Sequence, residues 1–85
     1  MKLYFTNDSK QKKLIIESDY AEDIFDTTIA FFEERKRFPH FFHIDAIENC
    51  ARISFGSVTE FFLIEDFSEK DYDDLEELFK EYDIY

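Results

Sequence analysis

Glycine and proline are almost absent from this chain, whose 85 residues include one Gly and one Pro. These two residues supply many turns, flexible linkers and low-complexity tracts, and a phosphate-binding loop needs several Gly residues. The sequence therefore predicts regular helices and strands joined by short turns. At this length we expect one domain covering residues 1–85, with no room for a multidomain enzyme.

Apolar and acidic residues dominate the composition. Hydrophobic residues make up 45% of the chain and aromatic residues 20%, including twelve Phe, so we expect a packed core rather than a disordered acidic chain. The 21 Asp and Glu outnumber the 10 Lys and Arg, which gives a formal net charge of -11. We therefore expect no direct binding to nucleic acid, because such binding depends on neutralising phosphates with basic residues.

The sequence carries no signal for secretion or a membrane. The single cysteine, Cys50, has no partner for an internal disulfide, and no charged start is followed by an apolar stretch of signal-peptide length. The longest continuous apolar run in the predicted strands, residues 61–64, is far shorter than the roughly 20 residues needed to cross a bilayer. We therefore expect a cytoplasmic protein with no membrane partner.

Five segments of strand-favouring or alternating residues predict an antiparallel sheet. The first two form a hairpin across residues 7–9, the next two turn at residues 48–49, and the last follows a turn at residues 56–57. The five segments are residues 2–6, 12–17, 41–48, 51–55 and 60–65.

The last of these segments is predicted to be the central strand, because its continuous apolar run is bounded by Glu60 and Glu65. Phe61 and Phe62 are neighbours in it and must point to opposite faces of the sheet. One of them therefore either meets a second layer or forms an exposed apolar patch. The C-terminal helix or a second copy of the protein would cover such a patch.

A first helix is predicted between the two groups of strands, ending near Arg37 because Pro39 restricts the residue before it to extended geometry. Ser18 and Asp19 both favour an N-cap, and Asp19 with Glu22 has the spacing of a capping box. Apolar residues recur at helical spacing on one face of this segment. Acids in its first turns and bases in its last turn match the helix dipole.

A second helix is predicted to begin after the cap residue Ser68 and to pack by a narrow apolar stripe. The stripe comprises Tyr72, Leu75, Phe79 and Tyr82, with Leu78 beside it. Together these elements predict an α+β fold, a two-layer sandwich in the order ββαββ(β)α. Its antiparallel sheet carries the main helix on one face, and the acidic helix ends the chain.

Most of the excess negative charge lies in the last quarter of the chain. From Glu65 onward there are ten acids and two bases, a net charge of -8. As a helix, residues 69–83 are about 22 Å long with roughly one carboxylate per 3 Å, close to the phosphate spacing of about 3.4 Å along one DNA strand. We therefore hypothesise a negative face that binds a basic protein of the nucleic-acid-binding type. The candidate partner-binding residues are Asp71, Asp73, Asp74, Glu76, Glu77, Glu81, Asp83 and Tyr82.

Two other interpretations of the acidic helix are open. Charge runs are commonly solvated helix faces, although like charges four apart on a helix each cost about 0.2–0.5 kcal/mol, which favours selection for something beyond folding. Alternatively, the protein is a structural or regulatory homodimer that associates through an apolar sheet face. In that case, the acids only keep it soluble.

The sequence predicts no metal, cofactor or catalytic site, and we expect the chain not to be an enzyme. Residues 71–74, Asp-Tyr-Asp-Asp, lack the central Gly of an EF-hand loop. His40, His43 and Cys50 are too few for a structural zinc site, which needs four ligands and usually paired cysteines. Cys50 and either His also belong to no recognisable nucleophile motif, so we expect Cys50 to be a small buried residue.

Three segments carry a family resemblance: residues 1–7 (Met-Lys-Leu-Tyr-Phe-Thr-Asn), 12–15 (Lys-Lys-Leu-Ile) and 56–62 (Gly-Ser-x-Thr-Glu-Phe-Phe). Together they resemble a group of short, uncharacterised proteins encoded by phages and prophages of Gram-positive bacteria. The resemblance covers residues 1–65 and transfers no catalytic assignment. This chain has Val58 where that group usually has His or another polar residue.

The resemblance implies a small accessory protein acting in the cytoplasm of a bacterial host. Proteins of this setting often bind and block host defence or replication proteins. Small acidic phage proteins include anti-CRISPR proteins and other inhibitors that imitate nucleic acid. The resemblance and the charge of the C-terminal helix therefore favour the same function by separate routes.

Overall fold

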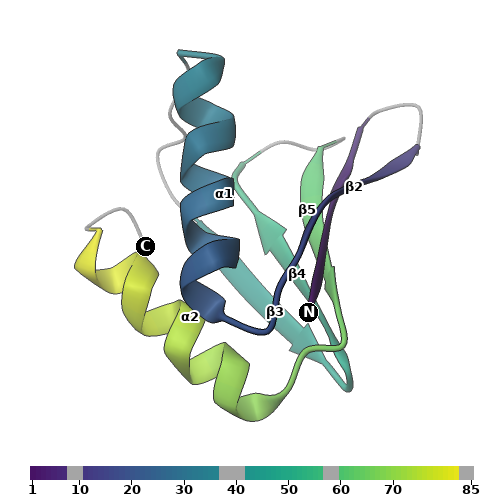
Figure 1. Ribbon diagram of the computed structural model, residues 1–85, viewed down its shortest axis with the longest axis vertical. Coiled ribbons are helices and arrows are strands. Elements are labelled where there is room, and N and C mark those ends of the chain that lie inside the picture. Colours follow the sequence, from purple (N-terminus) through teal and green to yellow (C-terminus); the bar gives the residue numbers. More distant parts are fainter. Residues whose placement is uncertain (8–10, 37–41, 57–59, 83–85) are drawn as a thin grey trace.

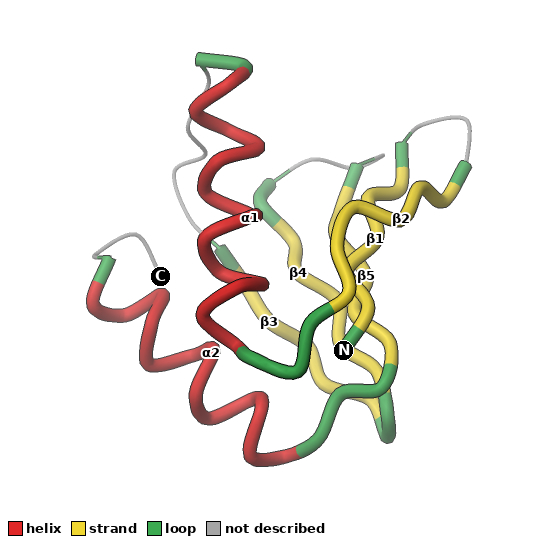
Figure 2. The backbone as a smooth tube through the Cα atoms, in the orientation of Figure 1, coloured by secondary structure: helices red, strands yellow, loops and turns green. Residues whose placement is uncertain are grey.

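Five strands and two helices make up this computed structural model, which describes residues 1–7, 11–36, 42–56 and 60–82. In chain order they are β1 (Lys2–Thr6), β2 (Lys12–Glu17), α1 (Ala21–Glu34), β3 (His43–Ile47), β4 (Cys50–Ser54), β5 (Phe61–Glu65) and α2 (Glu69–Glu81). The predicted α+β two-layer sandwich is confirmed. Both helices lie on the same side of the sheet, as the ribbon in Figure 1 and the tube in Figure 2 show.

The strands form one antiparallel sheet in the order β2-β1-β5-β4-β3. The continuous apolar strand β5 is central, as predicted, with β1 on one side and β4 on the other. The predicted turn between β3 and β4 is also confirmed, since Ile47 pairs with Cys50 across Glu48 and Asn49. Glu48 occupies this turn with a positive φ of 50°.

The core lies between the inner face of the sheet and the two helices. Phe62 and Ile64 of β5 are fully buried, and α2 contributes Leu75 and Phe79, which are also fully buried. The Phe79 ring lies 5.0 Å from the Phe25 ring of α1, with centroids in an edge-to-face arrangement. The narrow apolar stripe predicted for α2 is therefore the surface by which this helix packs.

The opposite face of the sheet, called here the open face, is not covered by either helix in the part of the chain that the structure describes. Phe62 points into the core and Phe61 points to the open face, where it is half-buried, so the prediction that the two rings diverge is confirmed. The strand positions on the open face are Lys2, Tyr4, Thr6, Lys12, Leu14, Glu17, His43, Asp45, Ile47, Cys50, Arg52, Ser54, Phe61, Leu63 and Glu65.

Two predictions about local structure are wrong. Cys50 is exposed rather than buried, because its neighbour Ala51 occupies the inner face and the alternation of β4 turns Cys50 outward. The predicted capping box of Asp19 and Glu22 does not form, because the N-cap of α1 is Tyr20, which makes no side-chain cap hydrogen bond.

The end of α1 also differs from the prediction. The helix ends at Glu34 with Arg35 as its C-cap, so its last turn contains no basic residue. Arg37 and Pro39, on which the predicted end rested, lie outside the described residues. Ser57 of the predicted turn at residues 56–57 lies outside them as well, whereas Gly56 is described and has a φ of 93°.

Candidate functional site: an acidic groove between the two helices

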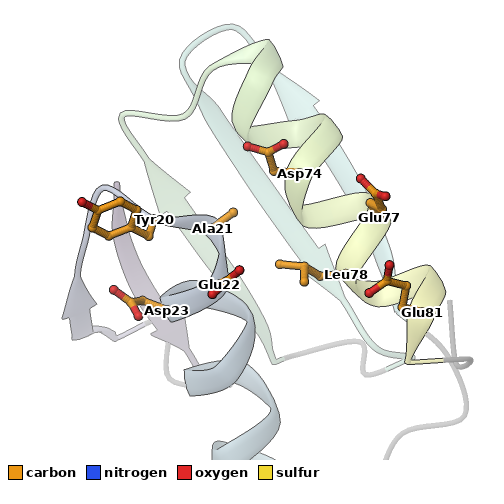
Figure 3. A pocket seen from close by; sticks show the side chains of 8 residues that line it. All are labelled: Tyr20, Ala21, Glu22, Asp23, Asp74, Glu77, Leu78 and Glu81. Carbon is orange, nitrogen blue, oxygen red and sulfur yellow. The ribbon is translucent and has the colours of Figure 1, made fainter.

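An open groove of about 630 Å³ lies where the start of α1 passes the second half of α2. Figure 3 shows carboxylates from both helices around it, with Leu78 reaching from α2 toward Ala21. Eight residues line it: Tyr20, Ala21, Glu22, Asp23, Asp74, Glu77, Leu78 and Glu81. Five of the eight are acidic and none is Lys or Arg.

The α2 side of the groove is a row of three carboxylates. Asp74, Glu77 and Glu81 are three and four residues apart, so they lie along one side of the helix over about 10 Å. Leu78 lies beside this row and is half-buried. Because Leu75 and Phe79 hold the adjacent side of α2 in the core, the row is fixed in orientation toward the groove.

The α1 side of the groove is built from the N-terminus of that helix. Glu22 and Asp23 lie in its first turn, where the partial positive charge of the helix end stabilises carboxylates. The Ser18 hydroxyl donates a hydrogen bond of 2.5 Å to Asp23 Oδ2 and accepts one of 3.1 Å from the Tyr20 amide. Ser18 thereby orients the acidic turn, a role that replaces its predicted role as the cap.

The rim of the groove carries one aromatic ring. Tyr20 is 72% exposed at the edge of the groove. A tyrosine ring offers its face to cations and its hydroxyl to hydrogen bonds. The groove therefore combines an apolar floor, carboxylate walls and an aromatic rim, which suits the aliphatic stem and cationic head of Arg or Lys.

The other predicted acids of α2 do not join this groove. Asp71 belongs to the capping box of the helix: its Oδ2 accepts hydrogen bonds from the Ser68 amide at 3.0 Å and the Ser68 hydroxyl at 2.9 Å. Glu76 pairs with Lys80 one turn later, with 2.9 Å between the carboxylate oxygen and the ammonium nitrogen. These two carboxylates are therefore engaged within α2 itself.

Three further candidates from the sequence lie elsewhere. Asp73 is exposed on α2 and is not among the residues that line the groove. Tyr82 is the C-cap of α2, and its ring packs edge-to-face on Phe25 at 5.7 Å while remaining 38% exposed. Asp83 lies outside the described residues. Of the eight candidates, the structure thus brings together Asp74, Glu77 and Glu81.

The sequence did not predict that Tyr20, Glu22 and Asp23 line the groove. From the sequence, Glu22 and Asp23 are predicted only to match the dipole of the first helix. Glu22 and Asp23 share a surface with the second helix because α1 packs against α2. This packing brings together residues about 50 positions apart in the sequence. The spacing of residues within one helix does not indicate which residues of another helix will lie beside it.

The described residues contain no group of three or more His, Cys, Asp or Glu side chains placed to hold a metal ion. Two of the three residues considered above as zinc ligands are described. His43 contacts Asp45, with 2.8 Å between Nε2 and Oδ1, and Cys50 is exposed on the open face. His40 lies outside the described residues. Neither described helix is long and apolar enough to cross a lipid bilayer.

Comparison with protein-family models, with curated proteins and with solved structures finds no match to this chain. The chemistry of the acidic groove therefore carries the functional argument.

Proposed function

We propose that this chain is a non-enzymatic binding protein that occupies a basic, nucleic-acid-binding surface of another protein. The observation that carries the proposal is the acidic groove, in which five carboxylates from two helices face a common space with no Lys or Arg among its lining residues. Such a site attracts guanidinium and ammonium groups by charge and binds them by charge-assisted hydrogen bonds.

The dimensions of the groove favour a protein surface as its ligand. The row of Asp74, Glu77 and Glu81 covers about 10 Å, which is about the axial length of four successive phosphates of a nucleic-acid strand spaced about 3.4 Å apart. A surface that binds successive phosphates presents several Arg or Lys side chains at a similar spacing. The apolar floor at Leu78 accepts the methylene stems of those side chains.

The resemblance to phage and prophage proteins supplies the proposed setting. The protein acts in the cytoplasm of a bacterial host, where it blocks a nucleic-acid-binding protein of defence or replication in the manner of an anti-CRISPR protein. The excess of negative charge, with 21 acids against 10 bases, is in keeping with a ligand that competes with DNA or RNA.

A pair of variants with equal charge tests the groove. The groove variant combines Asp74→Asn, Glu77→Gln and Glu81→Gln, and the control variant combines Asp26→Asn, Glu33→Gln and Glu34→Gln, which are exposed and outside the groove. Each triple variant changes the net charge from -11 to -8. Any difference between the two variants therefore reports the position of the charges and not their number.

The measurement is capture of proteins from a bacterial lysate on immobilised wild type, groove variant and control variant, with elution by NaCl or by double-stranded DNA. We expect wild type and control to retain the same partner, which DNA displaces and which elutes between about 0.1 and about 1 M NaCl. Three lost contacts of about 0.5 kcal/mol each weaken retention by the groove variant about tenfold.

Equal retention by the groove and control variants would refute the groove as the binding site. A partner that DNA fails to displace would refute the proposal that a nucleic-acid-binding surface is occupied.

A further inference from the structure

We propose that a pocket between the end of α1 and the edge strand β2 binds a small amphiphilic anion, a molecule with one carboxylate on an apolar body. This pocket, called here the cationic pocket, has a volume of about 360 Å³. Apolar side chains and exposed charged side chains line it, among them Phe5, Ile15, Phe31, Lys13, Glu34 and Arg35. None of its lining residues lines the acidic groove, so the inference does not rest on the proposed function.

A bulge in β2 shapes the pocket on the side of the sheet. Tyr4 pairs with Leu14 while Leu3 pairs with Ile16, so Ile15 is an extra residue in the pairing of β1 with β2. An extra residue of this kind bends its strand, and bulges are common next to binding sites. Since β2 is an edge strand of the sheet (Figure 1), the bend opens space beside α1.

The bulge also determines the direction of Lys13. This residue pairs with Phe5, whose ring lies in the core, so Lys13 is on the face of the sheet that carries the helices. An inward charge on an edge strand also discourages pairing with another sheet. That role needs one charge and does not account for Arg35, which comes from α1 and lines the same pocket.

Two aromatic rings hold Arg35, the C-cap residue of α1, in place. The central carbon of its guanidinium lies 3.8 Å from the centre of the Phe31 ring and 5.3 Å from the centre of the Phe5 ring. A guanidinium has its N–H donors in its own plane, so contact with a ring face leaves them available to a carboxylate. Because the side chain is ordered before a ligand arrives, the entropy cost of binding is lower.

Neither cation has an acidic partner in the part of the chain that the structure describes, where the ion pairs involve neither Lys13 nor Arg35. Acids outnumber bases by 21 to 10 in the whole sequence. In the described lining of the pocket, however, Lys13 and Arg35 outnumber the acid Glu34. The pocket is therefore a local positive site on a negative protein, which favours an anion as its ligand.

The apolar lining defines the other half of the ligand. Ile15 and Phe31 are half-buried and Leu14 is 49% exposed, so apolar surface remains uncovered with Arg35 in place. The volume of about 360 Å³ is at the lower end of the roughly 300–1,000 Å³ of small-molecule pockets. An inorganic anion would leave the apolar surface in water, and a neutral molecule would leave both cations without a partner. A carboxylate on a ring or a short alkyl chain satisfies both requirements.

NMR titration of the isotope-labelled whole chain tests this inference with a set of related probes. Cinnamate has the carboxylate and the apolar body, cinnamamide replaces the carboxylate by a neutral amide, cinnamylamine replaces it by a cation, and acetate lacks the apolar body. We expect cinnamate to shift the amide signals of Phe5, Ile15 and Arg35 saturably, with a Kd of about 1 mM. The other three probes are expected to bind at this pocket at least about tenfold more weakly.

The net charge of the chain provides an internal control. At a net charge of -11, the protein as a whole repels anions, so general electrostatic attraction does not account for saturable binding of cinnamate.

Two matched pairs of variants locate the site. Lys13→Gln and Arg35→Gln each remove one cation of the pocket, whereas Lys36→Gln and Lys70→Gln remove the same charge at exposed positions that do not line it. We expect each pocket variant to weaken cinnamate binding at least about threefold, while both controls bind cinnamate as the wild type does. Circular dichroism verifies that each variant is folded.

The proposal would be overturned by cinnamate shifts that fail to saturate, or by equal affinity for cinnamate and cinnamamide. Binding that is unchanged in both pocket variants, or weakened equally in their controls, would overturn it as well. Since the probes and variants address residues outside the acidic groove, failure of this inference is distinct from failure of the proposed function.

Discussion

Lys12 connects three strands on the open face. It lies on β2, its ammonium is 4.1 Å from the centre of the Tyr4 ring on β1, and it forms an ion pair with Glu65 on β5. Arg52 on β4 makes the equivalent contact on the other side, 4.1 Å above the Phe61 ring. These two cations cover the aromatic faces of the central strands, which explains why both rings are half-buried without a second layer.

The ion pair between Lys12 and Glu65 shifts the pKa values of both side chains. The hydrogen bond from Lys12 lowers the pKa of Glu65 below its ordinary 4.5, and the same bond raises the pKa of Lys12 above 10.5. Glu65 therefore stabilises the fold at pH values above 4.5, and this contribution is lost as the pH falls through its lowered pKa. The contribution of Lys12 is complete below pH 10.5 and is lost as the pH rises through its raised pKa.

We expect Lys12→Gln to bring the pKa of Glu65 back toward 4.5, as measured by carbon NMR of its carboxylate across a pH titration. Lys13→Gln is the control, because Lys13 pairs with Phe5 and so lies on the other face of the sheet. A Glu65 titration curve that is unchanged by Lys12→Gln would contradict the ion pair.

The exposed thiol gives a second prediction. Cys50 is the single cysteine of the chain and lies on the open face, so in dilute solution the folded protein is expected to react with a disulfide reagent such as DTNB at a rate close to that of the urea-unfolded chain. Absorbance of the released thiolate follows the reaction, with Cys50→Ser as the blank. Reaction that begins only on addition of urea would show that the thiol is buried.

The sequence contained the information needed to place Cys50 correctly. Ala51 and Ile53 belong to the alternating apolar pattern of β4, so a strand with these residues inward must turn Cys50 and Arg52 outward. The prediction that Cys50 is buried follows the general tendency of free cysteines to be buried and not the local alternation of β4. In contrast, the divergence of Phe61 and Phe62 was predicted, because it follows from strand geometry alone.

At the scale of elements, the turn between β3 and β4 stores conformational strain. Glu48 has a φ of 50°, a region that costs a side chain with a Cβ atom roughly 1 kcal/mol or more and that glycine adopts freely. Two-residue hairpins place glycine at such positions for this reason.

We expect Glu48→Gly to have a free energy of unfolding about 1 kcal/mol higher than Glu48→Ala, measured by urea denaturation. Glu48→Ala is the matched control, since it removes the same charge but keeps the Cβ atom. If the two variants were equally stable, the turn would not be strained at this position.

The two helices differ in how much of their role was predictable. The cap and the stripe of α2 follow from local spacing, and the capping box at Ser68 and Asp71 satisfies its N-terminus. The helix ends at Glu81, so it is shorter than the segment 69–83 that was treated as helical. The groove depends instead on where α1 crosses α2, which is set by contacts such as that of Phe25 with Phe79. That is why Asp74, Glu77 and Glu81 were candidates from the sequence while Glu22 and Asp23 were not.

At the scale of the whole molecule, self-repulsion opposes folding. A net charge of -11 on 85 residues places many carboxylates within a Debye length of one another at low salt. We expect the thermal midpoint of the wild type to rise when NaCl increases from about 0.02 to about 0.5 M, followed by circular dichroism at a concentration where the chain is monomeric.

The groove variant tests the origin of this effect. With Asp74→Asn, Glu77→Gln and Glu81→Gln, the thermal midpoint at low salt is expected to exceed that of wild type and to respond less to added NaCl. A midpoint independent of salt in both proteins would show that the carboxylates do not repel each other appreciably in the folded state.

The two layers of the sandwich carry very different charge: the open face of the sheet is balanced, and the helix layer holds the acidic groove. This separation gives the molecule an electric dipole directed across the sheet. Near a positively charged surface, the freely tumbling chain experiences a torque that turns its helices toward that surface before any atoms touch. A larger share of diffusional collisions then arrives in a productive orientation, so the charge sets the rate of capture as well as its strength.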